Sequence, residues 1–529
     1  MITYRSIQNA TCRVRAAGAI ALTAAALMAA FPRAEAQSTQ IFRYHRNDIL
    51  GTSFDLQVAA SDEKQADAVE ATALDEIERL RKILSTYDPA SDISRVNATN
   101  DPVACPPELI QVLGYYDWWN AKSKGAYNGH LGELIATWKA AEKAGALPDA
   151  ATLQPIVQRL AQPGWKIDPA AHTVARLTSQ PLNIDSLGKG YIISQAVVAV
   201  KAKLPAIPGF LLNIGGDLFA SGHPSPGAAW LISVANPARS EDNAPPLTQL
   251  RLVDRAVSTS AAYERGYNIG GKHYSHIFDP RTGWPAEGSA SATVIAPFSS
   301  SSNALATTLC VLKPDEGLQL AAQVQGMECL IIGQDGQQYR SPHFASYEVR
   351  QAQPQASATP AASGGQPPAK AGLWPNGYEV TLAISLKVPA EPNFRHLKRP
   401  FMAVWVTDAN GKAVRTIAVW GNQRKYLPEL HEWWKVAKDD PDWAATVTRA
   451  TRSAGHYRLD WDGMDDHGAP LPPGTYTIIQ EVNREFGDYV IKKGTIVCGK
   501  DPAKGSIPAS SEFDQTDITY GPPPAPSAP

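Results

Sequence analysis

Four short segments combine glycine, polar and aromatic residues in patterns suited to binding a nucleotide. They are LSTYDPASDISRVN (84–97), NIDSLGKGY (183–191), NIGGD (213–217) and HIFDPRTGWP (276–285). Near a helix start, Gly188 and Gly190 would free backbone N–H groups to face a pyrophosphate, and Lys189 would add a positive charge. Tyr87 and Tyr127 carry rings that could stack on an isoalloxazine or adenine ring. Together the segments indicate a dinucleotide site.

Each segment taken singly has a simpler structural interpretation. Asp-Pro, Gly-Gly-Asp and Arg-Thr-Gly are turn formers, and Leu-Gly-Lys-Gly-Tyr can simply open a helix. The site is not of the Rossmann type, because no GxGxxG follows an N-terminal strand with an acidic residue about 20 positions further on.

Composition limits the class of protein. The chain has 529 residues, of which 44% are hydrophobic and 19% charged, so it can bury a large core spread over two or three domains. Its 49 basic and 51 acidic residues give a net charge of -2. This balance provides no electrostatic surface for nucleic acid, so we expect small molecules and proteins as partners.

The N-terminus has the layout of a signal peptide. Arg5, Arg13 and Arg15 precede an uncharged alanine-rich run over 16–31, and Ala-Glu-Ala ends at residue 36. We expect cleavage after residue 36 and a periplasmic mature protein without a transmembrane segment; the alternative is a membrane anchor, for which the run is barely long enough.

The cysteines do not indicate a metal. Cys105, Cys310, Cys329 and Cys498 remain after cleavage and form no CxxC pair, which argues against zinc. A Cys310–Cys329 disulfide and isolated buried thiols are both compatible with the sequence.

Two segments poor in large apolar residues divide the chain. Residues 351–372 are rich in Pro, Ala, Gln, Ser and Gly and are typical of a flexible linker, and the Pro-rich stretch 501–529 is predicted to be a disordered tail. They separate a body over 40–350 from a smaller domain over 373–500.

The body mixes helical and strand patterns, which predicts an α+β fold. Residues 62–84 carry apolar side chains at helical spacing, whereas short strands are expected at 54–58, 210–214, 230–234 and 291–296. In the second domain, alternating runs at 378–388, 402–406, 414–420 and 476–482 predict an all-β, immunoglobulin-like sandwich.

Two groups in this second domain invite a functional interpretation. Asp462, Asp465 and Asp466 lie in a Trp-Asp-Gly turn; calcium is the alternative, but the EF-hand order of ligands is missing. Trp433 and Trp434 could contact a partner, although two core aromatic residues are the simpler account.

The order of the body segments resembles the FAD:protein FMN transferase family, also called ApbE or flavin transferase. The matching pieces are Leu50-Gly51-Thr52, LSTYDPASDISRVN, GAYNGHLGELIATW (125–138), NIDSLGKGY, NIGGD, VSTSAAYERGY (257–267), HIFDPRTGWP and NALATTLCVL (303–312). They span nearly all of residues 48–345. The second domain resembles the DUF2271 family, and its 459–485 segment is similar to the terminal hairpin of FlgD-type immunoglobulin-like domains.

The resemblance implies a magnesium-dependent transfer of FMN from FAD to a Ser or Thr hydroxyl of a target protein, with release of AMP. By match to the family pattern, it implies FAD contacts at Leu50, Tyr87, Ala126, Tyr127, Asn128, Asn183, Lys189 and His276. It implies a catalytic role for His276, and metal ligation by Ser186, through its carbonyl, and by the side chains of Asn303 and Thr307.

The sequence departs from the family pattern around the expected pyrophosphate. Asn303 stands where the family carries the metal-binding Asp, Asn128 and Asn183 replace two further Asp residues, and Leu50 replaces a Met. Because Mg²⁺ prefers charged oxygen ligands, we expect weakened metal binding unless Asp185, Asp217 or Asp279 supplies a replacement.

The family's acceptor motif, Asp-x-x-(Ser/Thr)-Gly-Ala-(Thr/Ser), is absent from the chain. The acceptor is therefore expected to be a flavoprotein on another chain. Two alternatives share the same FAD site: a non-catalytic periplasmic FAD-binding protein, and a hydrolase that converts FAD to FMN and AMP.

Overall fold

The computed structural model describes residues 39–178, 180–238, 246–262, 265–349, 374–375, 377–387, 399–421, 424–439, 444, 448–449, 451–452, 454–484 and 488–522. The signal peptide expected at 1–36 and the linker expected at 351–372 lie outside these residues. In the described part of the chain, no helix is long and apolar enough to cross a membrane.

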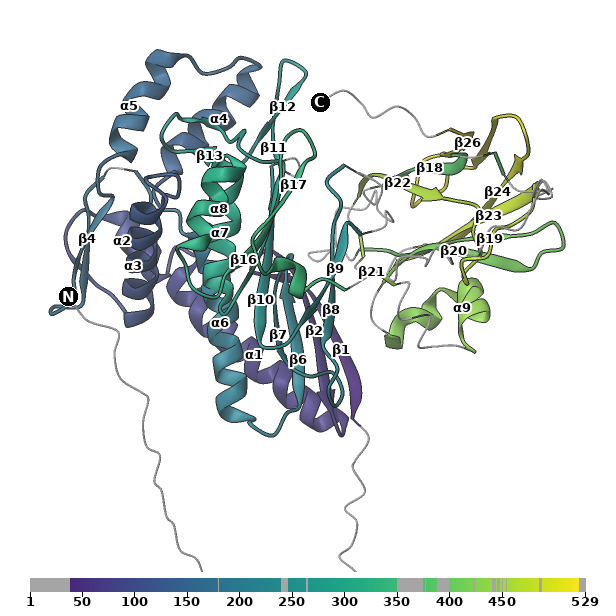
Figure 1. Cartoon of the computed structure of the whole chain (residues 1–529), viewed down its shortest axis with the longest axis horizontal. Coiled ribbons are helices and arrows are strands. Elements are labelled where there is room, and N and C mark those ends of the chain that lie inside the picture. Colours follow the sequence, from purple (N-terminus) through teal and green to yellow (C-terminus); the bar gives the residue numbers. More distant parts are fainter. Residues whose placement is uncertain are drawn as a thin grey trace, which may run out of the picture. The chain divides into compact units, whose positions relative to one another are not determined.

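The body is built on one antiparallel sheet with strand order β1-β2-β6-β7-β10-β15-β16-β17 (Figure 1). Its strands are β1 (Gln40–Ile49), β2 (Thr52–Ala60), β6 (Gly209–Ile214), β7 (Asp217–Gly222), β10 (Arg255–Ala261), β15 (Ser291–Ala296), β16 (Glu328–Ile332) and β17 (Gln338–Arg340).

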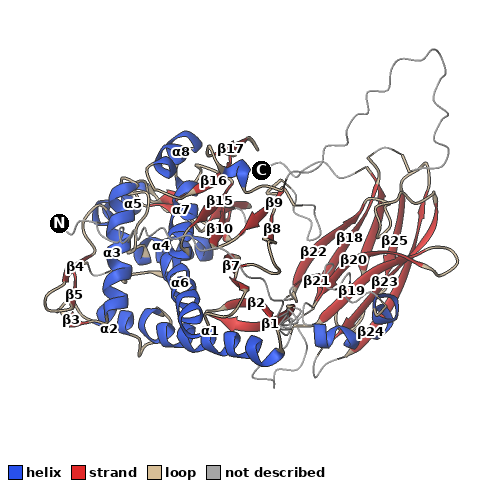
Figure 2. Cartoon of the chain, turned by 60° about the horizontal axis from the view of Figure 1, so that its bottom comes forward, coloured by secondary structure: helices blue, strands red, loops and turns tan. Residues whose placement is uncertain are grey.

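Helices cover one face of this sheet, as Figure 2 shows. They are α1 (Glu63–Leu84), α6 (Asp185–Lys203) and α7 (Ser299–Val311), with α2 (Asp92–Ala98), α3 (Pro107–Lys122) and α8 (Pro314–Ala322) beside them. The apolar stripe of α1 faces this core, and Asp62 caps the helix by accepting a hydrogen bond from the Gln65 N–H. The helix predicted at 62–84 is confirmed.

Smaller elements complete the body. The other face of the sheet packs against the hairpin of β8 (Trp230–Val234) and β9 (Thr248–Leu252) and against η1 (Phe344–Ser346). A separate apolar cluster joins α4 (Gly132–Ala144), α5 (Ala150–Leu160), β11 (Gly266–Ile269), β12 (Lys272–Ser275) and β13 (Phe278–Asp279), and β13 pairs with β14 (Trp284–Pro285). A small three-stranded sheet is formed by β3 (Val103–Ala104), β5 (Thr173–Arg176) and β4 (Trp165–Asp168). The predicted α+β class and all four predicted strands of the body are confirmed.

The C-terminal domain is a sandwich of two sheets, ordered β22-β18-β26-β25 and β21-β20-β19-β23-β24. Its elements are β18 (Glu379–Leu386), β19 (Phe401–Thr407), β20 (Ala413–Trp420), η2 (Arg424–Glu429), α9 (His431–Ala437), β21 (Thr448–Arg449), β22 (Gly455–Trp461), β23 (Gly474–Asn483), β24 (Tyr489–Cys498), β25 (Ala503–Ile507) and β26 (Thr516–Gly521). One apolar cluster joins residues from both sheets, and another packs η2 and α9 against β19, β20 and β23. The predicted all-β sandwich is confirmed.

The disordered tail predicted from residue 501 is wrong for 501–522. Strand β26 pairs with β18 on one side and β25 on the other. Ile507, Phe513 and Ile518 are fully buried in the sandwich core, so this segment is part of the domain. Backbone pairing with β18, more than 100 residues earlier, supplies the order that the local composition does not indicate.

The simpler interpretations of the two groups in this domain hold. Asp462 and Asp465 accept hydrogen bonds from nearby backbone N–H groups, and Asp466 accepts one from Thr416. Trp433, in α9, is fully buried, whereas Trp434 is partly buried against the same apolar cluster, so the core assignment holds in full only for Trp433. The four described cysteines are unbonded to one another and buried, which confirms isolated thiols.

Candidate functional site

Three of the predicted site residues, Asn183, Ser186 and Lys189, lie at the start of α6. The helix begins at Asp185, inside the NIDSLGKGY segment, as the glycine pattern predicts. The Asn183 N–H donates to the Gly129 carbonyl at 2.8 Å, which joins this segment to the predicted FAD-contacting residues 126–128. The Asn183 side-chain oxygen in turn accepts the Asp185 N–H at 3.3 Å. Asn183 therefore fixes the start of α6.

Two buried tyrosines hold the Ser186 side chain. The Tyr116 and Tyr127 rings stack with centroids 5.1 Å apart, and each hydroxyl lies 2.9 Å from Ser186 Oγ. Burial raises the pKa of both tyrosines, so both stay neutral. Because Tyr127 is only 2% exposed and Tyr116 covers one face of its ring, the predicted stacking of Tyr127 on FAD is not supported. Its hydroxyl instead positions Ser186.

Lys189 connects α6 to the NIGGD turn between β6 and β7. Its Nζ forms an ion pair with the nearly buried Asp217 and donates to the Gly215 carbonyl at 3.4 Å. Gly215 and Gly216 have φ values of +56° and +90°, which glycine adopts without the strain of a side chain. The Asp217 carboxylate is thus already neutralised within the chain.

Leu50 lies in the β1–β2 turn beside this NIGGD turn. Its φ is +52°, and Gly51 follows with +72°. A Cβ on Gly215 would lie 2.6 Å from Thr52 Oγ1, and the Gly215 N–H donates to Ser53. The two turns are therefore neighbours, which brings Leu50 to the same end of the sheet as Lys189.

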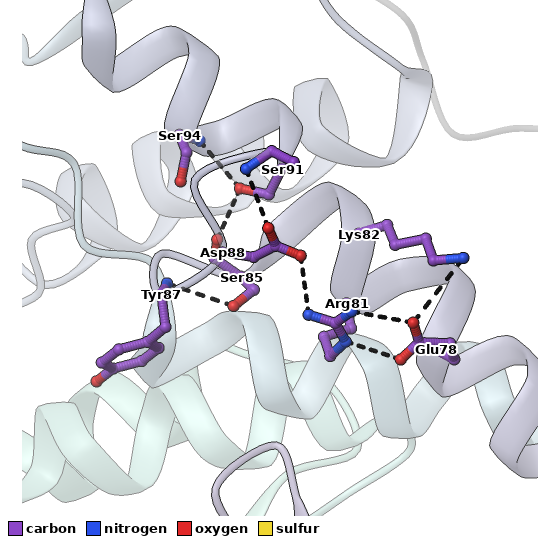
Figure 3. Close-up of polar contacts among 9 residues, drawn as sticks. Glu78, Arg81, Lys82, Ser85, Tyr87, Asp88, Ser91 and Ser94 are labelled. Carbon is purple, nitrogen blue, oxygen red and sulfur yellow. Dashed lines mark hydrogen bonds and ion pairs between the residues drawn. The ribbon is translucent and has the colours of Figure 1, made fainter.

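Tyr87 projects from the loop after α1, which ion pairs and caps hold rigidly (Figure 3). Arg81 pairs with Asp88 at 2.9 Å, and Ser91 Oγ donates to the Ser85 carbonyl while capping α2. The Tyr87 side chain is 85% exposed and points away from these contacts. Of the two predicted aromatic residues, Tyr87 is the one with a ring available for stacking.

The Tyr87 hydroxyl donates to Asp185 Oδ2 at 3.1 Å. The negative charge of Asp185 is the main cause that raises the pKa of Tyr87, and Arg265 opposes this effect. The hydroxyl therefore stays protonated and able to donate.

Ala126 and Asn128 are buried under the site. Asn128 uses both ends of its side chain internally: Nδ2 donates to Leu160 at 3.0 Å, and Oδ1 accepts the His130 N–H at 2.9 Å. In the structure Asn128 thus braces the loop that carries Tyr127.

His276 is exposed at the start of the HIFDPRTGWP segment. Its Nδ1 lies 3.0 Å from the Arg265 carbonyl, and its backbone N–H donates to the same oxygen. If Nδ1 carries the proton for that contact, Nε2 carries the lone pair. Asp279, further along, pairs with Arg281 and closes a turn, so it has the structural role rather than that of a replacement metal ligand.

Asn303 and Thr307 lie one turn apart on the same face of α7. Asn303 is buried and its Oδ1 has no hydrogen-bond partner among the described residues, whereas Thr307 Oγ1 lies 3.3 Å from Ser260 Oγ. An unpaired buried oxygen normally carries a desolvation penalty of about 1–3 kcal/mol. A ligand that binds this oxygen would remove the penalty.

Helices α6 and α7 approach closely at Gly190. A Cβ there would lie 2.5 Å from the Ser299 carbonyl oxygen, and Ser194 Oγ receives the Ser300 N–H. Ser186 lies one turn before Gly190, and Asn303 lies one turn after Ser299. This contact fixes the two helices that carry the predicted metal-binding residues.

The three predicted metal ligands offer the oxygen atoms that magnesium prefers, but none of them carries a negative charge. Ser186 offers a carbonyl, Asn303 an amide oxygen and Thr307 a hydroxyl, all hard oxygen donors. Among the described residues, no group of three or more His, Cys, Asp or Glu side chains could hold a metal. Asp185, Asp217 and Asp279 are all engaged within the chain. Charge balance for a cation must come from the bound substrate.

Sequence reasoning missed Tyr116 and left Asp185 unplaced. Tyr116 sits in the YYDWW run of α3, where an aromatic residue looks like ordinary core, so no local signal separates it. The contacts of Asp185 depend on residues almost 100 positions earlier.

The fold and these segments together define a class of flavin-handling protein. Residues 50–331 match the model of the ApbE family. The chain therefore belongs to the ApbE family. Residues 381–515 match the DUF2271 model, described as a predicted periplasmic protein.

Relatives with known names support this membership. A FAD:protein FMN transferase of Klebsiella pneumoniae is 25% identical over 57% of this chain and 87% of its own, and one of Treponema pallidum is 27% identical over 49% and 75%. The ApbE protein of Thermotoga maritima has the same fold, with a TM-score of 0.53 and 22% identity over 59% of this chain and all of its own. Apo flavinyl transferase ApbE of Pseudomonas stutzeri gives 0.50 and 22% over 59% and 99%.

Proposed function

We propose that this protein is an FAD:protein FMN transferase that moves FMN from FAD to a Ser or Thr hydroxyl of another protein. The observation that carries the proposal is the ApbE family match over residues 50–331, within which the predicted FAD-contacting segments form one connected set around the first turn of α6. The names of the relatives point to the same activity.

The reaction needs positioning more than covalent chemistry from the protein. The acceptor oxygen forms a bond to the phosphorus of the FMN half, and the bond from that phosphorus to the bridging oxygen breaks. AMP leaves with the bridging oxygen. Lys189 and the backbone of the NIGGD turn provide the polar wall against which the pyrophosphate would lie.

His276 is proposed as the catalytic base. With Nδ1–H donating to the Arg265 carbonyl, the lone pair on Nε2 can accept the proton of the acceptor hydroxyl. The exposure of His276 suits a group that must meet a second protein.

The Ser186 carbonyl, Asn303 Oδ1 and Thr307 Oγ1 are proposed to hold magnesium. The cation would neutralise charge on the phosphate oxygens and on the leaving AMP. The buried, unpartnered Asn303 Oδ1 is the observation that supports this assignment.

We propose a periplasmic location and an acceptor flavoprotein with a Ser/Thr flavinylation motif on another chain. The description of the DUF2271 family and the signal-peptide layout of residues 1–36 support the location. The lack of an acceptor motif in this chain supports a separate partner.

The direct test is to incubate the purified protein with FAD, Mg²⁺ and a substrate carrying the acceptor motif. Covalent flavin is read by in-gel fluorescence and AMP by chromatography. We expect both products in equal amounts. FAD binding without either product would contradict an enzymatic function and favour the non-catalytic alternative, whereas AMP without a labelled acceptor would favour hydrolysis.

His276→Asn should lower the transfer rate by about 10²–10⁴-fold, because a positioned base contributes roughly that factor. His273→Asn is the matched control, since His273 is an exposed histidine on the preceding strand that contacts Asn268 instead. Equal rates for the two variants would remove His276 from the mechanism.

A further inference from the structure

The Asp185 carboxylate receives hydrogen bonds from three side chains, two in the distant α1–α2 loop and one two residues before it. Thr86 Oγ1 donates to Oδ1 at 2.9 Å, and the Tyr87 hydroxyl donates to Oδ2 at 3.1 Å. Asn183 Nδ2 lies 3.5 Å from the same Oδ2. The family pattern and the sequence patterns give Asp185 no role in FAD binding. It is nevertheless the residue that joins the α1–α2 loop to the start of α6.

The loop around Tyr87 is already rigid without Asp185. The Arg81–Asp88 ion pair and the Ser91 contacts fix its backbone on the side away from the site (Figure 3). What these contacts leave free is rotation of the Tyr87 side chain, which is 85% exposed. The bond from its hydroxyl to Asp185 restricts that rotation.

We propose that Asp185 is a positioning residue: it holds the Tyr87 ring in the orientation that stacks on a planar aromatic ring of the bound dinucleotide. The proposal rests on the FAD-binding function above. The ligand class is a planar nitrogen heterocycle, either the isoalloxazine or the adenine of FAD. Holding the ring in advance saves the entropy of ordering it when the ligand binds, and this entropy is equivalent to about a two- to tenfold change in affinity.

Positioning and simple charge effects predict opposite results for Asp185. A carboxylate near a pyrophosphate repels it, so removing the charge alone would strengthen FAD binding, most of all at low salt. Loss of positioning would weaken binding. Tyr87→Phe separates the two effects further, because it keeps the ring and the Asp185 charge and deletes only the hydroxyl.

The experiment measures dissociation constants for FAD, FMN and AMP, without added metal, by flavin fluorescence and calorimetry. We expect Asp185→Ala and Tyr87→Phe each to weaken FAD binding about two- to tenfold. The double variant should be no weaker than either single variant, because both remove the same contact. If Tyr87 stacks on the isoalloxazine, the variants should bind FMN more weakly and quench its fluorescence less, while their affinity for AMP is unchanged. If Tyr87 stacks on the adenine, the variants should bind AMP more weakly, while their affinity for FMN is unchanged.

Asp168→Ala is the matched control. Asp168 accepts hydrogen bonds from the backbone N–H groups of Ala170 and Ala171 in the β4–β5 turn, a turn that carries none of the predicted site residues. This variant should bind FAD as the wild type does. Thermal unfolding of each variant verifies folding, and Asp185→Ser replaces any Asp185→Ala protein that is unfolded.

Wild-type affinity in Tyr87→Phe, or tighter binding by Asp185→Ala at low salt, would overturn the positioning role. Failure of the FAD-binding function on which the proposal rests has a different signature, because then the wild-type protein itself binds neither FAD nor FMN.

Discussion

The first turn of α6 and the facing turn of α7 both carry polar side chains, but the two turns differ in how completely these side chains are hydrogen-bonded. Around α6, each predicted site side chain has a partner: Asn183 and Ser186 are hydrogen-bonded, and Lys189 is paired with Asp217. On α7, Thr307 contacts Ser260, but Asn303 Oδ1 is buried without a partner in the described part of the chain. The α6 side is completed by the chain itself, whereas the α7 side is left for a ligand to complete.

This difference separates two tasks of one site. A fully hydrogen-bonded turn is rigid before substrate arrives, which suits the recognition of a fixed shape. An unpaired buried oxygen destabilises the free protein slightly, and this desolvation penalty is removed only when a cation or a hydrogen-bond donor binds to the oxygen. Substrate affinity should therefore depend on α6 and metal affinity on α7.

The largest effect is expected from separating the two helices. Gly190→Ala would place a methyl group 2.5 Å from the Ser299 carbonyl oxygen, so α6 and α7 must move apart. We expect a loss of about 1–3 kcal/mol in the free energy of unfolding, together with loss of transfer activity. Urea unfolding followed by circular dichroism measures the first.

Gly188→Ala is the control for this prediction, two residues away on the same helix. A Cβ there meets only the Ile184 side chain at 4.0 Å, and alanine favours a helix over glycine by about 0.5–1 kcal/mol. We expect this variant to be as stable as the wild type or more so. Equal destabilisation by both changes would show that the close approach at Gly190 is not what joins the helices.

The second-largest expected effect is on Mg²⁺ affinity, and it tests whether α7 carries metal ligands. Asn303→Asp should raise Mg²⁺ affinity in the presence of FAD about tenfold, because a carboxylate replaces a neutral amide oxygen as ligand. Without a cation the same variant should be less stable than the wild type, since it buries a charge. Calorimetric titration and thermal unfolding with and without Mg²⁺ measure the two effects.

Asn128→Asp provides the matched control, because it restores another carboxylate of the family pattern. Both polar ends of Asn128 already bond within the chain, and Nδ2 donates to Leu160. A carboxylate cannot donate that bond, so we expect lower stability and no gain in Mg²⁺ affinity. An Asn303→Asp protein with unchanged affinity would show that residue 303 is not a ligand.

The sequence predicts the body of the fold well because the decisive signals are local. The apolar spacing in 62–84, with Asp62 as a cap, and the short runs rich in apolar residues specify α1 and the strands directly. The two glycines of NIGGD likewise identify the turn, because both have positive φ, and Gly190 identifies the close helix contact, because a side chain there would meet the Ser299 carbonyl.

Non-local contacts are what the sequence does not show. Strand β26 alternates buried Thr516, Ile518 and Tyr520 with exposed residues, but it follows a Pro- and Ser-rich stretch and depends on pairing with β18. In the sequence, Tyr116 cannot be told from an ordinary core residue, and only the structure shows its hydroxyl beside Ser186. The sequence predicts from residue type alone that Tyr127 stacks on an isoalloxazine or adenine ring, but in the structure Tyr116 stacks on the Tyr127 ring instead.

The smallest expected effect is on the free energy of unfolding, and it is tested by truncating one side chain on α6 and one on α7. Ser186→Ala removes the hydroxyl shared by Tyr116 and Tyr127, and we expect a loss of about 1 kcal/mol in unfolding free energy, limited because the two tyrosine hydroxyls remain close enough to interact. Asn303→Ala removes an oxygen without a partner, so its loss of packing is offset by relief of the desolvation penalty. We expect no net loss of stability for Asn303→Ala in metal-free buffer. A greater loss for Asn303→Ala than for Ser186→Ala would mean that Asn303 is held within the chain as firmly as Ser186, and the contrast between the two helices would disappear.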